Sequence, residues 1–212
     1  MMIYRDRKHA GELLARALST HGGKDTLVVG LPRGGMPVAQ EVARLLGAPL
    51  DVFVVRKLGL PWQPELAMGA IATGGVLVRN EDVLRTLPDS GKVLDSVRRE
   101  EQKVLEDRER RYRSGRPGLE VTGRKVIVVD DGLATGATMK AAVQALRQAG
   151  AARVVVAVPV GPPDTCAELR DLADEVVCLQ EPRMFSAVGQ WYDDFGQTSD
   201  EEVTQILGAE EP

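Results

Sequence analysis

The chain has 212 residues, of which 27 are Lys or Arg and 31 are Asp or Glu, so its formal net charge at pH 7 is −4. This acidic balance argues against a general nucleic-acid binder or a protein drawn to anionic membranes, and no apolar run approaches the length of a membrane span. We therefore expect a small-molecule partner, and a single domain over residues 1–212 that can bury a substantial core.

The first twenty residues have a polar start followed by an amphipathic helical pattern that also contains acidic side chains. This pattern matches neither a secretory signal nor an acid-poor transit peptide, so we expect a cytoplasmic protein. Apolar strand-like runs then alternate with helical periodicity, which predicts an α/β fold with a mainly parallel sheet and helices on both faces. The expected strands are 26–30, 51–55, 68–73, 125–129, 153–159 and 175–179, and the clearest helical patterns cover 36–46 and 138–149.

The segment Gly30-Leu31-Pro32-Arg33-Gly34-Gly35-Met36-Pro37 follows the first expected strand and precedes a core helix. Gly34 and Gly35 would let backbone N–H groups converge on oxygens, and Arg33 offers a bidentate guanidinium group, so the segment could bind an anion. Taken alone, a Gly-Gly turn after a strand favours an ordinary connecting loop.

The second expected strand ends at Arg56 and Lys57, which are followed by an irregular segment over residues 58–67. Pro61 and Pro64 would stiffen that segment. The plain alternative for Arg56 and Lys57 is a pair of surface cations.

Residues 80–118 interrupt the alternation and form an expected helical insertion. This stretch is highly charged with interleaved acids and bases, which predicts a long solvated helix with intrahelical ion pairs, ended by Gly115, Arg116 and Pro117. Contact between its arginines and a nucleic acid is the weaker alternative.

The segment Val-Ile-Val-Val-Asp-Asp-Gly-Leu-Ala-Thr-Gly-Ala-Thr at residues 126–138 is the most informative in the chain. Asp130 and Asp131 fall at the carboxyl end of a buried strand, where α/β sheets bind ligands. Two carboxylates can accept hydrogen bonds from vicinal hydroxyls, while Thr135, Thr138 and the loop N–H groups can bind a phosphate at the start of the next helix. The alternative is an ordinary strand, turn and helix with a capping aspartate.

Four of the eight aromatic residues lie in the span 184–195, after the last expected strand. They are Phe185, Trp191, Tyr192 and Phe195. A flat heterocycle could stack on such a face, although the same residues could simply anchor the tail on the core.

Cys166 and Cys178 have neither the C-x-x-C spacing nor a nearby histidine. We therefore expect neither a zinc site nor a redox pair, but reduced packing residues. His9 and His21 are isolated, so surface or core positions are favoured over catalytic ones.

Residues 126–138 resemble the phosphoribosyl-pyrophosphate signature of the type I phosphoribosyltransferases, and the order of elements from about residue 26 to residue 195 is similar to that family, in particular to bacterial phosphoribosyltransferase-like proteins. The resemblance implies that Asp130 and Asp131 hold the ribose hydroxyls, with Asp131 also a catalytic candidate. The implied loop ligands are Gly132 and Leu133, followed by the 5-phosphate-binding residues Ala134, Thr135, Gly136, Ala137 and Thr138.

The same resemblance implies roles for the other motifs. Arg33, Gly34 and Gly35 would form a pyrophosphate loop, often of unusual peptide geometry, and Arg56 and Lys57 would be catalytic pyrophosphate ligands. Residues 58–67 would form a closing lid, in which Glu65 is the obvious acid or base. Phe185 would stack on the base, with Trp191 beside it, in a C-terminal hood over residues 180–212.

The implied activity is transfer of the 5-phosphoribosyl group from phosphoribosyl pyrophosphate to a nitrogenous base, by an enzyme that pairs as a homodimer. Mg²⁺ would be held largely by substrate oxygens, without a dedicated metal cage in the protein. Ala134 stands immediately before Thr135, whereas the 6-oxopurine enzymes place an aspartate at or next to this position, so the acceptor base stays open. The alternative function is a regulatory or sensor protein that binds phosphoribosyl pyrophosphate or a nucleotide without turnover.

Overall fold

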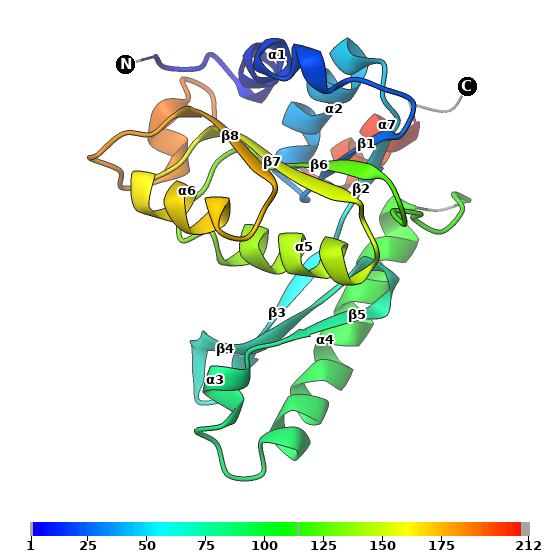
Figure 1. Cartoon of the computed structure of the whole chain (residues 1–212), viewed down its shortest axis with the longest axis vertical. Helices are drawn as coiled ribbons and strands as arrows, with labels where there is room; N and C mark the ends of the chain where they lie inside the picture. The colour runs from blue at the N-terminus through cyan, green and yellow to red at the C-terminus, as the bar shows by residue number, and fades with distance from the viewer. Residues whose placement is uncertain (1, 114, 209–212) are drawn as a thin grey trace.

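The computed structural model describes residues 2–113 and 115–208 (Figure 1). The side chain of Glu65, the candidate acid or base of the lid, lies outside the described residues, as does the end of the expected hood at 209–212. None of the described helices has the length and apolar character needed to cross a membrane.

A five-stranded parallel sheet forms the centre of the molecule (Figure 1). Its spatial order is β2 (Leu50–Val52), β1 (Thr26–Gly30), β6 (Lys125–Val129), β7 (Arg153–Val160) and β8 (Glu175–Gln180). β1, β6 and β7 are runs of β-branched and other apolar residues that are buried almost throughout, as expected for strands covered on both faces. The predicted mainly parallel α/β fold is confirmed.

Helices cover both faces of this sheet (Figure 1). α1 (Arg7–Ala17), α2 (Gly35–Leu46) and α7 (Asp200–Gly208) lie on one face, where Leu14, Met36 and Val203 join one apolar core. α5 (Ala137–Gln148) and α6 (Pro163–Arg170) lie on the other face, where Met139 and Leu169 join a second core. Short 3-10 turns occur at Ser19–His21, Thr73–Gly75 and Val188–Trp191.

A second, antiparallel sheet projects beside α5, and the sequence did not predict it. It consists of β3 (Val55–Leu60), β4 (Gln63–Ala72) and β5 (Val76–Arg79). The prediction of one strand over residues 51–55 is therefore wrong, because β2 ends at Val52 and a separate strand, β3, begins at Val55. The strand expected at 68–73 belongs to β4, and the irregular segment expected at 58–67 is mostly β3 and β4 around a tight turn.

The charged insertion contains a short helix, α3 (Glu81–Leu84), and the long α4 (Ser90–Tyr112). The predicted long helix is present and most of its residues are exposed or half-buried, but Leu94, Leu105 and Tyr112 are buried in the first apolar core. Arg56 of β3 also pairs with Glu101 of α4 at 2.6 Å. The helix is thus attached along one side to the antiparallel sheet.

We predict that Leu105→Ala lowers the free energy of unfolding by about 2–5 kcal/mol, because it leaves a cavity at a fully buried position. The neighbouring Val104→Ala, at a residue that is 38% exposed, is the matched control and should change stability by less than about 1 kcal/mol. Urea unfolding measures both. Equal effects of the two substitutions would mean that α4 is not packed against the core.

Candidate functional site

The candidate site lies where the parallel sheet changes its direction of winding. From β1 the order runs to β2 on one side and to β6, β7 and β8 on the other, and Gly30 at the end of β1 is paired with Val129 at the end of β6. The loops that follow these two strands therefore leave the sheet side by side. Such switch points are where open α/β sheets bind ligands.

Asp130 and Asp131 stand at this point, directly after β6. The backbone N–H of Asp131 donates to Oδ1 of Asp130 at 2.8 Å, which ties the first carboxylate to the turn. Burial raises the pKa of Asp130 well above its usual value, and the neighbouring charge of Asp131 raises it further. Burial also raises the pKa of Asp131, although Arg7 opposes this shift. The pair therefore favours a ligand that brings hydrogen-bond donors or positive charge.

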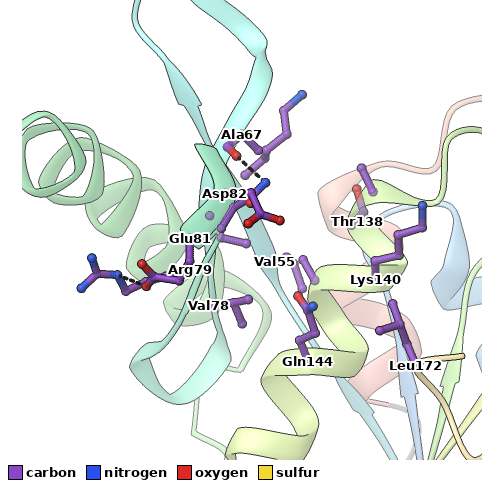
Figure 2. Close-up of a pocket in the computed structure, with 16 residues that line it drawn as sticks. Val55, Ala67, Val78, Arg79, Glu81, Asp82, Thr138, Lys140, Gln144 and Leu172 are labelled. Carbon is purple, nitrogen blue, oxygen red and sulfur yellow. Dashed lines mark hydrogen bonds and ion pairs between the residues drawn. The ribbon is translucent and has the colours of Figure 1, made fainter. Parts of the chain in front are cut away.

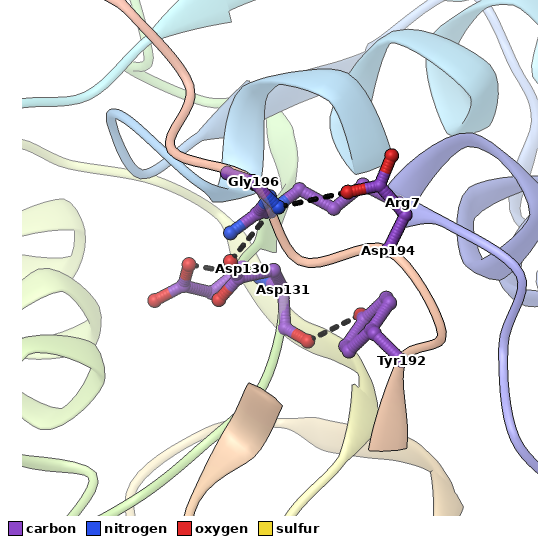
Figure 3. A network of polar contacts seen from close by, with 6 residues as sticks. All are labelled: Arg7, Asp130, Asp131, Tyr192, Asp194 and Gly196. Atoms are coloured by element: carbon purple, nitrogen blue, oxygen red, sulfur yellow. Dashed lines mark hydrogen bonds and ion pairs between the residues drawn. The ribbon is translucent and has the colours of Figure 1, made fainter. Parts of the chain in front are cut away.

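Arg7 of α1 is a member of the site that the sequence reasoning missed (Figure 3). Its Nε donates to Oδ2 of Asp131 at 2.8 Å, and its Nη1 donates to the carbonyl of Gly196 at 2.6 Å. Its guanidinium group also lies 4.0 Å from the centre of the Phe195 ring. Arg7 and Asp131 are 124 positions apart, so no local pattern indicates their pairing.

Tyr192 holds the backbone of the same aspartate (Figure 3). Its hydroxyl donates to the main-chain carbonyl of Asp131 at 2.6 Å. Tyr192 is buried against Tyr4. The acidic pair is thus positioned by residues from both ends of the chain, on α1 and in the segment after β8.

Gly34 and Gly35 bring the loop after β1 directly against this pair. A Cβ on Gly34 would lie 2.1 Å from Oδ2 of Asp131, and one on Gly35 would lie 2.7 Å from the carbonyl oxygen of Val129. Only glycine permits this approach. The N–H of Gly35 already donates to the Leu31 carbonyl at 3.0 Å, so the expectation that it turns toward a ligand does not hold in this conformation. The Pro32–Arg33 peptide bond is cis, and the Arg33 side chain is exposed.

The loop after Asp131 lines a cavity of about 190 Å³. Its walls include residues Gly132 to Thr138, with Val188 from the last segment opposite. Ala134, Thr135, Ala137 and Thr138 are exposed, and the first turn of α5 leaves N–H groups without intrahelical partners. Thr165 of α6 holds the loop in place, because its hydroxyl donates to the Ala134 carbonyl at 3.1 Å. This concave, donor-rich site suits a phosphate group.

A larger cavity of about 440 Å³ separates α5 from the antiparallel sheet (Figure 2). Ala137 and Thr138 border both cavities, so the two meet at the first turn of α5. Lys57 and Val55 of β3 line the larger cavity on one side, and Lys140 and Gln144 of α5 line it on the other.

The structure separates the two cations that the sequence placed together. Because successive side chains of a strand point to opposite faces, Lys57 borders the larger cavity, whereas Arg56 is directed to α4. There, Nε of Arg56 donates to Glu101 at 2.7 Å. Of the two, Lys57 is the one that faces the candidate site in this conformation.

The two aromatic candidates also occupy different environments. Trp191 is only 3% exposed and stacks on Phe185, with ring centres 6.4 Å apart and planes 11° apart. Trp191 therefore anchors the last segment on the core and has no free face for a base. Phe185 is half-buried, and Val188 lies against Gly132 of the loop, so this end of the segment remains next to the site.

Known proteins are similar to this chain over most of its length. A family model described as phosphoribosyl transferase domain matches residues 2–195. A provisionally named phosphoribosyl transferase of Mycobacterium tuberculosis, from strains CDC 1551 and H37Rv, is 53% identical over 207 residues, which are 98% of this chain and 47% of the relative. The chain thus spans about half the length of these curated relatives.

A solved structure has the same fold over nearly its whole length. The crystal structure of the protein TT1426 from Thermus thermophilus is 49% identical and has a TM-score of 0.89, with 97% of this chain and 98% of that chain covered. Together with the paired aspartates, the loop at 132–138 that follows them (the phosphate-type loop) and the family match, this likeness leads to one conclusion. The chain belongs to the phosphoribosyl transferase domain family.

Proposed function

We propose that the protein is an enzyme that transfers the 5-phosphoribosyl group of phosphoribosyl pyrophosphate to a ring nitrogen of a nitrogenous base and releases pyrophosphate. The observation that supports this most directly is the juxtaposition of the buried Asp130–Asp131 pair with an open, donor-rich loop at the switch point of the sheet. The pair suits vicinal hydroxyls, and the loop suits a phosphate.

In the proposed complex, Asp131 and Asp130 accept hydrogen bonds from the ribose hydroxyls. The run from Ala134 to Thr138 then binds the 5-phosphate at the positive end of the α5 dipole. Arg7 keeps the Asp131 carboxylate ionised and correctly oriented, because it donates to Oδ2 of that group. Arg7 is a positioning residue in this scheme.

The transfer is a displacement at C1 of the ribose. The lone pair of the acceptor nitrogen forms the new C1–N bond as the C1–O bond to pyrophosphate breaks, with inversion at C1. The bonding pair of the C1–O bond leaves with pyrophosphate, and the proton of the acceptor nitrogen passes to water. Negative charge develops on the leaving oxygen, so a cation that faces the site lowers the barrier. Lys57 is our candidate for this role because it borders the cavity that meets the loop at Thr138.

Mg²⁺ fits the donor set of the site, because carboxylate oxygens are ligands that this cation prefers. In the described structure, Oδ1 of Asp130 accepts a hydrogen bond from the N–H of Asp131, and Oδ2 of Asp131 accepts one from Arg7. The other carboxylate oxygen of each aspartate can bind the cation directly or through a water molecule. When bound with the substrate, the ion would neutralise pyrophosphate charge.

The proposal is tested by pyrophosphate release from phosphoribosyl pyrophosphate and Mg²⁺ across a panel of purine and pyrimidine bases. We expect release with at least one base and none with Asp131→Ala, which should also weaken substrate binding in calorimetry by about 100-fold or more through loss of charged hydrogen bonds. Asp193→Ala, at an exposed carboxylate, is the matched control. Binding without release for every base would instead favour the sensor function.

Arg7→Leu should make binding of phosphoribosyl pyrophosphate more sensitive to acid. Arg7 lowers the pKa of Asp131, so its removal raises that pKa, and the ionised form needed to accept hydrogen bonds is lost at a higher pH. As the pH is lowered from about 8 to about 5, the affinity of the variant for phosphoribosyl pyrophosphate should begin to fall at a higher pH than the affinity of the wild type. Arg5→Leu, an exposed neighbour, is the control, and superimposable profiles for all three proteins would contradict the positioning role.

Lys57→Ala should reduce the rate of pyrophosphate release by about 10²-fold, as expected for the loss of one transition-state donor. Arg56→Ala should reduce the rate much less and act mainly on stability, because Arg56 pairs with Glu101. Single-turnover rates and urea unfolding separate the two effects. Equal losses of rate in two stably folded variants would show that both cations reach the substrate.

A further inference from the structure

The fold gathers two thiols and a carboxylate, none of which belongs to the acidic pair or to the loop that follows it. Cys166 lies on α6, Cys178 lies on β8, and Glu181 directly follows β8. One ligand atom of each residue, the two Sγ atoms and a carboxylate oxygen, lies within 4.8 Å of the other two. Both cysteines are free and pack in the second apolar core, in line with the prediction of reduced packing residues, but their spacing in the sequence did not indicate that they lie together with Glu181.

We propose that Cys166, Cys178 and Glu181 form a binding site for Zn²⁺ or a similar borderline-soft divalent cation. Zn²⁺ accepts thiolates and carboxylates as ligands, so the three residues can bind the ion without any substitution. The spread of the three ligand atoms is small enough for one ion to contact all of them after side-chain adjustment.

Groups next to the cluster hold its ligands in place. The guanidinium group of Arg170 forms an ion pair with Glu181, and its Nη1 lies 3.3 Å from Oε2 of that carboxylate. A hydrogen-bonded carboxylate is held in orientation for a metal while its remaining lone pairs can bind. In the metal-free chain the thiol of Cys178 donates to the carbonyl of Gln180 at 3.1 Å, and the ion takes the place of this proton when it binds.

Charge at the cluster balances once the ion is bound. Two thiolates and one carboxylate bring three negative charges, and the ion and Arg170 bring three positive charges. The neutral total suits the setting, because Cys166 is buried and the other two ligands are half-buried. Binding releases one proton from each thiol, so affinity should fall as the pH is lowered.

The proposed site would join α6 to the edge strand β8. α6 also carries Thr165, whose hydroxyl holds the Ala134 carbonyl of the phosphate-type loop. A bound ion would therefore stiffen the support beneath that loop, while a water molecule completes the coordination of the ion from the exposed side. The role of the ion is structural, and the site does not depend on the proposed transferase activity.

The test uses the whole chain, freed of metal and kept reduced with a phosphine, and Co²⁺ as the probe. We expect saturable binding of one ion with a thiolate-to-cobalt absorption band, displaced by Zn²⁺, and a rise in melting temperature with Zn²⁺. Cys178→Ser should weaken binding by about 100-fold or more and Cys166→Ser should do the same, while Glu181→Gln should weaken it about 10–100-fold. Glu168→Gln, on the same helix α6 but paired with Lys140, is the control and should bind normally.

Two results would overturn the proposal. One is the lack of a thiolate band with the folded wild-type chain at excess Co²⁺, and the other is undiminished binding by the Cys166→Ser/Cys178→Ser double variant with a native circular dichroism spectrum. If the reduced chain binds no cobalt, yet hydrogen peroxide converts both thiols to a disulfide with reduction of the peroxide to water, the pair is a redox pair and the metal assignment is wrong.

Discussion

Two adjacent carboxylates at the carboxyl end of a buried strand are the constraint on which the rest of the site depends. Burial disfavours the ionised forms of both Asp130 and Asp131, and the charge of Asp131 further disfavours that of Asp130. The protein offsets this cost with the Arg7 guanidinium group and holds the turn with the Tyr192 hydroxyl. Because these two residues lie near opposite ends of the described chain, the site can form only when α1 and the segment after β8 are both docked.

The same constraint explains the glycines after β1. The loop must pass so close to Asp131 that a side chain at Gly34 would overlap the carboxylate. Gly34 and Gly35 therefore act first as packing residues that let two loops share one switch point. Ligand contact by this loop, chiefly through the exposed Arg33, stays a prediction from the sequence.

Both sheets contribute residues to the candidate site. The parallel sheet, which has an apolar core on each face, holds the acidic pair and the start of the phosphate-type loop at the end of β6, and this favours a rigid geometry. The antiparallel sheet carries Lys57 across a cavity from α5 and is held in place by α4 through Arg56 and Glu101. Arg56 thus positions the strand on which its neighbour faces the cavity. The shared border of the two cavities at Thr138 is where these two parts of the site meet.

The sequence by itself determined the features that are local in the chain. Apolar runs identified β1, β6, β7 and β8, and the Asp-Asp pair with its small-residue loop indicated the candidate site, because strand period and loop composition can be read from consecutive residues. Only the tertiary structure decided which side chains meet. It separated Arg56 from Lys57 by strand alternation, buried Trp191, brought Arg7 to Asp131, and gathered Cys166, Cys178 and Glu181. These contacts depend on how distant elements pack, and no spacing within a short segment encodes them.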